Sequence, residues 1–580
     1  MAFPAPVVSL TDLAYGRDPL LDGWIMHFMT SNNLDHALNP HLNASDDQLG
    51  FMVDLNPGRI FFPCSGRTMR LLLAPTASEE LVRRYGQVWR QTIGLLKKSQ
   101  IDGYKFKEII QACRYRFLGA LSEHVLIPSR LQKRLSGLLL RRSGLDDPLR
   151  EEKKVRNQAV RNFVHSADFD LLLNARPRLS KGHRLDSLKH ELSMIELSRL
   201  LTISTWRGLW TSNADDYDLA GLKNELGHAD YLYPVIQWSH DQNATQTTIL
   251  YMPDESGEII MDCRIIRMLL SHGYKVILAL KGGFDFYRSS ISDLENDPVL
   301  AATLKNAHIE YDVAISKNDL LKRLAANRLL VISDGQCEET NLCRASVTFA
   351  RAWKEADFVL AKGVGNYRRF MMNPAKFTRD MICFYRGQDR CRFMFKAKSP
   401  HVRKYSSSDL TAKAEAIIED MRQAKAGGRT IIFYSAIVGS IPGQTQAAIT
   451  LLEVFVNYMR VKIDSSFIIN PAEHFEPGLD GDDLMFMWEK VQRSGYLDIW
   501  RFQTSEDIEK SFELMGQKVP PVWAGKDATF STGCTKEMKI ALEMQAVYRE
   551  LQIIGPDPAK FFRRRDYGVG GYVDSMISGR

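Results

Sequence analysis

Two adjacent carboxylates and a lysine beside a glycine are the side chains of this sequence that could do chemistry together. Asp254 and Glu255 follow a short apolar segment and precede Gly257. Adjacent carboxylates offer the hard oxygen ligands that hold Mg²⁺ or Mn²⁺ while leaving positions open for water. Lys362 precedes Gly363, and an ammonium group beside a Gly-rich turn is suited to bind phosphate oxygens. A metal ion facing a lysine is the electrostatic clamp that phosphoryl transfer requires.

These residues follow segments that have the pattern of strands in one sheet. The short β-rich segments are 247–252, 274–280, 329–333, 357–361 and 392–396. Because they alternate with stretches of helical spacing, they predict an α/β fold with a doubly wound, mostly parallel sheet. Ligands of such sheets bind beyond the carboxyl ends of the strands. We therefore expect one pocket to be formed by the loops 254–258, 281–288, 333–336 and 362–366.

Three segments resemble the motifs of a known family. Residues 254–262 read Asp-Glu-Ser-Gly-Glu-Ile-Ile-Met-Asp. They are similar to the Asp-Asn-Ala-Gly-Glu-Ile-x-x-Asp signature of the metal-dependent damage-control phosphatases, the acidic-residue methyltransferase-like domain once catalogued as a domain of unknown function. Residues 356–367 resemble the Ala-Asp-Leu-Val-Ile-Ala-Lys-Gly-x-Gly-Asn-Phe/Tyr motif of that family, and residues 393–400 resemble its closing strand. The resemblance covers about 245–405 and indicates a divergent member with an added C-terminal region.

The resemblance implies a hydrolase that cleaves a small phosphate monoester, such as a sugar phosphate, with the help of a divalent metal ion. It implies Mg²⁺ or Mn²⁺, with Co²⁺ or Ni²⁺ as further possibilities, and a small phosphorylated metabolite as the partner. Asp254, Glu255 and Lys362 match catalytic positions, and Glu255 stands where the family has Asn. The implied phosphate-binding residues are Ser333, Gly335, Lys362, Gly363 and Asn366.

One loop departs from the family pattern at a metal ligand. The family reads Arg-Gly-Gly-Pro-x-x-Asn-Asp, in which the last Asp binds the metal, whereas residues 281–288 read Lys-Gly-Gly-Phe-Asp-Phe-Tyr-Arg. Arginine cannot coordinate a cation. Either Asp285 completes a metal site with Asp254 and Glu255, or Arg288 replaces the ion with a fixed positive charge. A catalytically silent binding or regulatory module is therefore an alternative to the phosphatase, and a SAM-dependent carboxyl methyltransferase is a second alternative.

The chain divides into three parts by pattern. Residues 1–240 have apolar residues at helical spacing and predict a mostly helical N-terminal domain. Residues 241–405 predict the α/β domain that resembles the phosphatases. Residues 406–580 predict an additional α/β region that ends in a Gly/Arg-rich tail. We expect this region to continue or flank the central sheet, because the polar linker at 404–408 is short.

Composition places the chain among ordinary globular proteins. Its 580 residues are 45% hydrophobic and 25% charged, which excludes disorder or coiled coil as a description of the whole chain. Eight cysteines without a CxxC pair fit a reducing cytoplasm better than a disulfide scaffold. The net charge of +7 is mild and the Lys/Arg runs are short, which argues against nucleic acid as a partner. No apolar run reaches the ~18 residues of a membrane span. We therefore expect a cytoplasmic protein that does not contact membranes. If the chain has a protein partner, we expect that partner to bind the C-terminal region.

Overall fold

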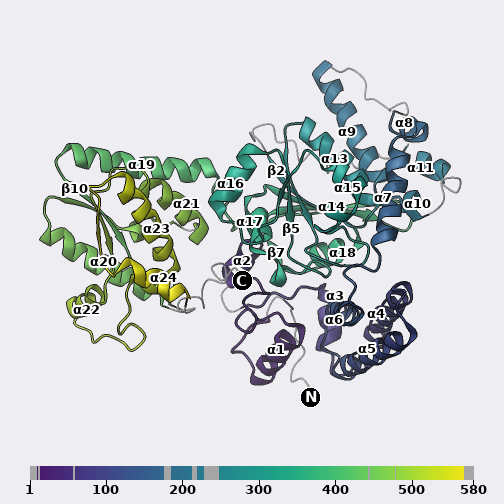
Figure 1. Cartoon of the computed structure of the whole chain (residues 1–580), viewed down its shortest axis with the longest axis horizontal. Coiled ribbons are helices and arrows are strands. Elements are labelled where there is room, and N and C mark those ends of the chain that lie inside the picture. The colour runs from purple at the N-terminus through teal and green to yellow at the C-terminus, as the bar shows by residue number, and fades with distance from the viewer. Residues whose placement is uncertain are drawn as a thin grey trace. The chain divides into compact units, whose positions relative to one another are not determined.

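The computed structural model describes residues 10, 13–55, 59–174, 185–211, 218–226, 247–441, 444–476 and 478–566. It divides into two compact units, Met1–Pro400 and His401–Arg580 (Figure 1). Most of the expected Gly/Arg-rich tail, residues 567–580, lies outside the described residues. Among the helices of the described part, none combines the length and the hydropathy that crossing a membrane requires.

The first unit is built around a seven-stranded sheet. Its strands in spatial order are β4 (His308–Glu310), β5 (Leu329–Ser333), β3 (Lys275–Leu280), β2 (Thr248–Met252), β6 (Phe358–Lys362), β8 (Asp380–Arg386) and β9 (Cys391–Lys396). All neighbouring strands are parallel except β8 and β9. From β2 the chain moves outward through β3 and then returns to β6 on the other side of β2. The predicted doubly wound, mostly parallel sheet is therefore confirmed.

Two hydrophobic cores lie on the two faces of this sheet. Leu250 and Met252 of β2 belong to one core, and Ile249 and Tyr251 belong to the other, as the two-residue period of a strand requires. Buried residues from before residue 150 fill the first core, whereas buried residues of the segment 160–226 fill the second. The N-terminal helices therefore cover both faces of the sheet (Figure 1).

The first unit contains many helices, most of which begin at a side-chain cap. Ser78 and Asp102 accept hydrogen bonds from the first free N–H groups of α4 and α5, which stabilises a helix start. The helices before the large sheet are α1 (Pro19–Asn32), α2 (Asp46–Gly50), α3 (Gly66–Leu73), α4 (Glu79–Lys98), α5 (Gly103–Glu123), α6 (Pro128–Ser143), α7 (Arg150–Val164), α8 (Ala167–Leu173), α9 (Leu185–Ile203), α10 (Gly208–Thr211) and α11 (Leu219–Leu226). The helices among its strands are α13 (Glu258–Ser271), α14 (Asp293–Asn296), α15 (Pro298–Thr303), α16 (Lys317–Ala326), α17 (Val347–Glu355) and α18 (Val364–Asn366). A two-stranded antiparallel ladder joins β1 (Val53–Asp54) to β7 (Lys376–Phe377).

The second unit has a parallel sheet of its own. Its strands in spatial order are β11 (Ser466–Ile469), β10 (Thr430–Ser435), β12 (Ile499–Phe502) and β13 (Gln552–Ile554). Its helices are α19 (Ser407–Ala426), α20 (Thr445–Lys462), α21 (Gly481–Gln492), α22 (Ser505–Leu514), α23 (Thr532–Val547) and α24 (Pro558–Asp566). The described strands of this region pair only with one another, so the region does not continue the central sheet. The alternative, that it flanks that sheet, stays a prediction. The aromatic side chains of Phe433 and Trp488 find their partner surface inside this unit, with ring centroids 5.5 Å apart.

Candidate functional site

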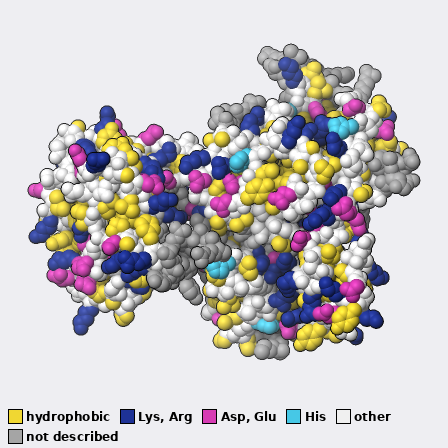
Figure 2. Space-filling view, in the orientation of Figure 1, with side chains coloured by type: hydrophobic (Ala, Val, Ile, Leu, Met, Phe, Trp, Pro, Cys, Tyr) yellow, Lys and Arg dark blue, Asp and Glu magenta, His cyan; other side chains and the backbone are white. Residues whose placement is uncertain are grey.

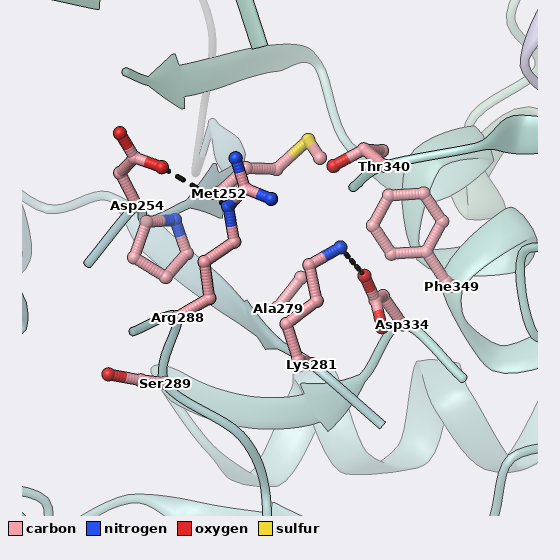
Figure 3. A pocket seen from close by; sticks show the side chains of 10 residues that line it. Met252, Asp254, Ala279, Lys281, Arg288, Ser289, Asp334, Thr340 and Phe349 are labelled. Carbon is pink, nitrogen blue, oxygen red and sulfur yellow. Dashed lines mark hydrogen bonds and ion pairs between the residues drawn. The ribbon is translucent and has the colours of Figure 1, made fainter. Parts of the chain in front are cut away.

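The carboxyl ends of β2, β3 and β5 bring the expected loops to one small pocket (Figure 3). The charged and hydroxyl side chains that line it are Asp254, Lys281, Arg288, Ser289, Asp334 and Thr340. The loop after β6 reaches the same place, because a Cβ atom on Gly363 would lie 1.9 Å from Oδ2 of Asp254. The cavity volume is about 10 Å³, which is about the space that one water molecule needs. The site therefore lies where the strand order reverses, as ligand sites of doubly wound sheets do.

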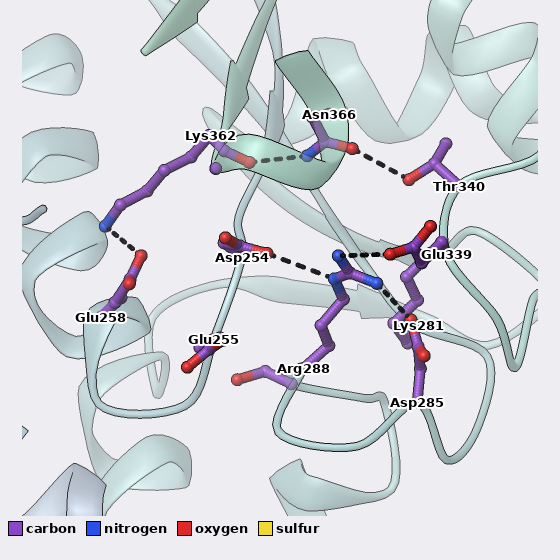
Figure 4. Close-up of polar contacts among 12 residues, drawn as sticks. Asp254, Glu255, Glu258, Lys281, Asp285, Arg288, Glu339, Thr340, Lys362 and Asn366 are labelled. Carbon is purple, nitrogen blue, oxygen red and sulfur yellow. Dashed lines mark hydrogen bonds and ion pairs between the residues drawn. The ribbon is translucent and has the colours of Figure 1, made fainter. Parts of the chain in front are cut away.

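Arg288 occupies the centre of this site (Figure 4). Its Nε donates to Oδ1 of Asp254 at 3.2 Å, and its Nη1 donates to Oδ2 of Asp285 at 2.6 Å. Its Nη2 lies 4.0 Å from Oε1 of Glu339. The Arg288 side chain is 17% exposed, and those of Asp254 and Asp285 are 12% and 5% exposed. One partly buried guanidinium thus bridges two of the carboxylates that were predicted to bind a metal ion.

The contact between Arg288 and Asp285 shifts the pKa of each of these two groups toward its charged form. Burial by itself raises the pKa of Asp285, but the positive charges of Arg288 and Lys281 outweigh it and hold the pKa below its ordinary value. Burial likewise opposes the charge of Arg288, yet the Asp285 and Asp254 carboxylates raise its pKa. Asp285 is therefore an ionised partner of arginine at neutral pH, whereas a general acid must hold a proton.

Glu255 forms ion pairs with two other arginines. Its carboxylate lies 3.3 Å from Nη1 of Arg156 on α7 and 2.7 Å from Nη2 of Arg207. Its backbone pairs with that of Arg288 in an isolated antiparallel bridge. Glu255, which stands where the family has Asn, thus has two cationic partners from the mostly helical part of the chain before the large sheet.

Lys362 is directed away from the pocket (Figure 4). Its Nζ lies 2.7 Å from Oδ1 of Asp262 and 3.0 Å from Oε2 of Glu258, both on α13, and its side chain is 1% exposed. Burial raises the pKa of Glu258 and of Asp262. Burial opposes the charge of Lys362, but the two carboxylates raise the pKa of its ammonium group. These three side chains form a buried ion-pair cluster that ties the end of β6 to α13.

The predicted phosphate-binding residues hold the loops of the site together. Ser333 Oγ accepts a hydrogen bond from the N–H of Gly335 at 3.0 Å. The Asn366 amide donates to the Lys362 carbonyl at 2.7 Å and accepts from the Thr340 hydroxyl at 3.1 Å. These contacts position the backbone around the pocket, and the phosphate-binding role of these residues and of Gly363 stays a prediction.

Sequence reasoning missed Glu339, Thr340 and Arg369 as parts of the site. Arg369 forms an ion pair with Glu339 and donates from Nη1 to the Pro63 carbonyl at 3.1 Å. The available signal was the polar stretch that begins at Glu338, a few residues beyond the expected third strand. Such stretches at strand ends belong to the ligand-binding edge of a doubly wound sheet.

Comparison with known proteins supports the resemblance seen in the motifs. A family model described as the damage-control phosphatase ARMT1-like domain matches residues 81–414. The chain belongs to this family. A crystal structure of a DUF89 family protein from Pyrococcus horikoshii is 18% identical to it, with a TM-score of 0.37, over 54% of this chain and 92% of that chain. No curated protein matches this chain.

The family is metal-dependent, but the side chains of this member do not fit a divalent cation as they lie. Asp254 and Asp285 share the guanidinium of Arg288, and Glu255 is paired with two further arginines. All three predicted ligands thus already have a cationic partner. Arginine itself offers no lone pair to a metal. A cation could bind Asp254 and Asp285 only after Arg288 had left, because the two like charges would repel each other.

Proposed function

We propose that this chain is a catalytically silent member of the damage-control phosphatase family, which serves as a binding or regulatory module. The observation that supports this proposal is the guanidinium of Arg288 between Asp254 and Asp285. A guanidinium can lie between the two carboxylates and offset one of their two negative charges, whereas a divalent ion would offset both. The guanidinium also has no open coordination position and so cannot activate a water molecule for hydrolysis.

The charge balance of the site supports the same proposal. Its cations are Lys281, Arg288 and Arg369, and its carboxylates are Asp254, Asp285, Asp334 and Glu339. With Glu255 and its partners Arg156 and Arg207 the site has five carboxylates and five cations, so it has no surplus positive charge to attract a phosphate dianion. The paired side chains also leave a cavity of only about 10 Å³, far below the ~300 Å³ of ordinary small-molecule sites.

Metal-dependent hydrolysis of a small phosphorylated metabolite, such as a sugar phosphate, is the second candidate. The family match and the cluster of Asp254, Glu255 and Asp285 favour it. If Arg288 swings out, Asp254 and Asp285 offer the hard oxygen ligands that Mg²⁺ or Mn²⁺ prefers, and Co²⁺ or Ni²⁺ would be further possibilities. In that case the ion would supply the charge and the activated water.

A thermal unfolding experiment with metal ions separates the two candidates. We expect millimolar Mg²⁺ or Mn²⁺ to leave the melting temperature of the natural chain unchanged. Arg288→Asp restores the residue type of the family and should bring a metal-dependent rise of a few degrees, because a ligand that binds only the native state stabilises it. Adding Asp254→Ala to that variant should abolish the rise.

The opposite result would favour the hydrolase. If either ion raises the melting temperature of the natural chain, and Asp254→Ala removes that effect, Arg288 does not replace the metal. Release of phosphate from a panel of sugar phosphates by the natural chain, lost in Asp254→Ala, would contradict the silent module directly.

A further inference from the structure

The helices α4, α5 and α6 carry most of the excess positive charge of the chain. Residues 79–143 contain 14 Lys and Arg side chains and five Asp and Glu side chains, a net charge of +9, whereas the whole chain has +7. Counting short runs of like charge along the sequence misses this excess, because the cations are spaced over three helices. Figure 2 shows Lys and Arg side chains gathered over the region where Figure 1 places these helices.

The three helices pack against one another through their apolar faces, which turns the cations outward. Ile109 and Cys113 of α5 are buried in the same core as Leu95 of α4 and Leu135 of α6. Lys105, Lys107, Arg114 and Arg116 of α5 are exposed. Of the described acidic side chains on α5, Glu108 pairs with Arg142 and Glu123 lies at the far end. The outer face of α5 therefore presents a surplus of cations to solvent.

Two exposed tyrosines lie on this face, each with cationic side chains beside it. Tyr104 is 81% exposed and Tyr115 is 76% exposed. Lys105 and Lys107 adjoin the first tyrosine, and Arg114 and Arg116 flank the second. Eleven residues are about three turns of helix, so the two tyrosines share one face and lie ~16 Å apart. Aromatic rings this exposed contribute nothing to the core, which leaves a binding role open to them.

We infer that the outer face of α5 binds single-stranded nucleic acid, with Tyr104 and Tyr115 as stacking surfaces for bases. Proteins that hold single strands combine cations that contact the phosphates with aromatic side chains on which bases stack. Lys105, Lys107 and the two arginines beside Tyr115 supply those cations.

The helix α4, which packs against α5, carries a row of exposed cations of its own. Arg83, Arg90 and Lys97 are exposed and follow one another at intervals of seven residues, so they form one stripe with a spacing of ~10 Å. A row of cations fits the regularly spaced phosphates of a nucleic acid backbone. An anionic membrane is a poorer fit, because a helix that lies on a membrane inserts its apolar face, and the apolar faces of α4 and α5 are packed in the core.

Binding of the full-length chain to a fluorescein-labelled dT20 oligonucleotide, followed by anisotropy, tests this inference. The charge variant replaces Lys105, Lys107, Arg114 and Arg116 by Gln. Its matched control replaces four exposed cations of the second unit by Gln, namely Lys518, Lys536, Lys539 and Arg549. The tyrosine variant combines Tyr104→Ser with Tyr115→Ser, and its control is Tyr311→Ser, at a tyrosine that is 56% exposed.

We expect the charge variant to bind dT20 at least about tenfold more weakly and to flatten the slope of log affinity against log salt by about 2 to 3. The tyrosine variant should lose about tenfold on dT20 and nothing on a 20-base-pair duplex, whose bases are already stacked. Both controls should bind as the natural chain does. The inference is overturned if dT20 does not bind, if the controls lose as much affinity, or if the chain binds only vesicles of phosphatidylcholine with phosphatidylserine.

Discussion

At the scale of single residues, the site depends on one side chain that has several partners at once. Arg288 contacts Asp254 and Asp285; the Asp285 carboxylate is buried and that of Asp254 is partly buried. Removing one partner of such a pair leaves an uncompensated charge in the interior, and that costs more than the pair itself contributes. The cluster is therefore sensitive to changes that a surface ion pair would tolerate.

We predict that Arg288→Ala lowers the free energy of unfolding of the first unit by about 3–5 kcal/mol. Urea denaturation of the natural chain and the variant measures this difference. Lys322→Ala is the matched control, because Lys322 pairs with Asp319 on the surface of the same unit, where ion pairs contribute little. Equal stabilities of Arg288→Ala and the natural chain would show that Arg288 is not held as described.

Gly363 is a second residue on which the site depends. Its φ is +96°, and an added Cβ would lie 1.9 Å from Oδ2 and 2.9 Å from Cβ of Asp254. Gly363→Ala should therefore displace the whole Asp254 side chain in addition to the ~1–3 kcal/mol cost of a backbone conformation that essentially only glycine adopts. Gly273 has a φ of +94° with nothing within 4 Å, so Gly273→Ala pays only the backbone cost. We expect Gly363→Ala to be less stable than Gly273→Ala by at least about 1 kcal/mol in urea denaturation; equal losses would contradict the contact.

The sequence predicted where these residues lie along the chain, but not where each side chain points. Asp254 and Arg288 follow strands that could be recognised, so their proximity could be expected. Lys362 is the last residue of β6, and its ammonium group turns toward α13 rather than toward the pocket. That direction depends on Glu258 and Asp262, which become its partners only once α13 has packed on the sheet.

At the scale of elements, the buried cluster of Lys362, Glu258 and Asp262 joins a strand to a helix. The same three residues belong to the two motifs that resemble the family, so those motifs here serve the packing of β6 against α13. The cluster places two carboxylates beside one ammonium group. It is closest to neutral when one carboxyl keeps its proton.

We predict that the first unit becomes less stable as the pH rises from about 5 to 8. Burial raises the pKa of Glu258 to about 8, so the folded chain retains a proton that the unfolded chain releases near its ordinary pKa. A raised carboxyl pKa gives stability that is complete below the unfolded pKa and is lost as the pH approaches the folded one. Urea midpoints measured across this range should fall for the natural chain and fall less for Glu258→Gln. A natural chain whose stability rose with pH would contradict the burial of this proton.

Strand prediction succeeded for most strands of the large sheet and missed two others, β8 and the three-residue β4. The segments 247–252, 274–280, 329–333 and 357–361 match β2, β3, β5 and β6 to within a residue or two. The strand at 392–396 exists as β9, but it pairs antiparallel with β8, which was not predicted. Because β8 and β9 are joined by a short turn, they form a hairpin, and the alternation of strands and helices gives no sign of it.

At the scale of the whole molecule, the chain consists of two units with separate sheets and cores. The sequence predicted α/β structure in both, because each has alternating strands and helices. The sequence could not predict that the second unit has a hydrophobic core that is complete by itself. That depends on long-range contacts, such as those of Phe433 with Trp488 and Trp500.

We predict that brief trypsin digestion cleaves the chain near Arg403 and yields two fragments that stay folded. Arg403 is exposed and follows directly on the boundary between the units. Each fragment should keep its far-ultraviolet circular dichroism and unfold in one cooperative transition, as single domains do. A fragment starting at residue 404 that has no cooperative transition would show that the second unit depends on the first.

The guanidinium at the centre of the candidate site has one more consequence. A bound ion can dissociate from its site, and the occupancy of that site follows the supply of the ion in the surroundings. Arg288 is part of the polypeptide, so the positive charge between Asp254 and Asp285 is present as soon as the chain has folded and does not dissociate on dilution. Chelators and metal starvation, which empty the sites of metalloenzymes, leave such a charge in place.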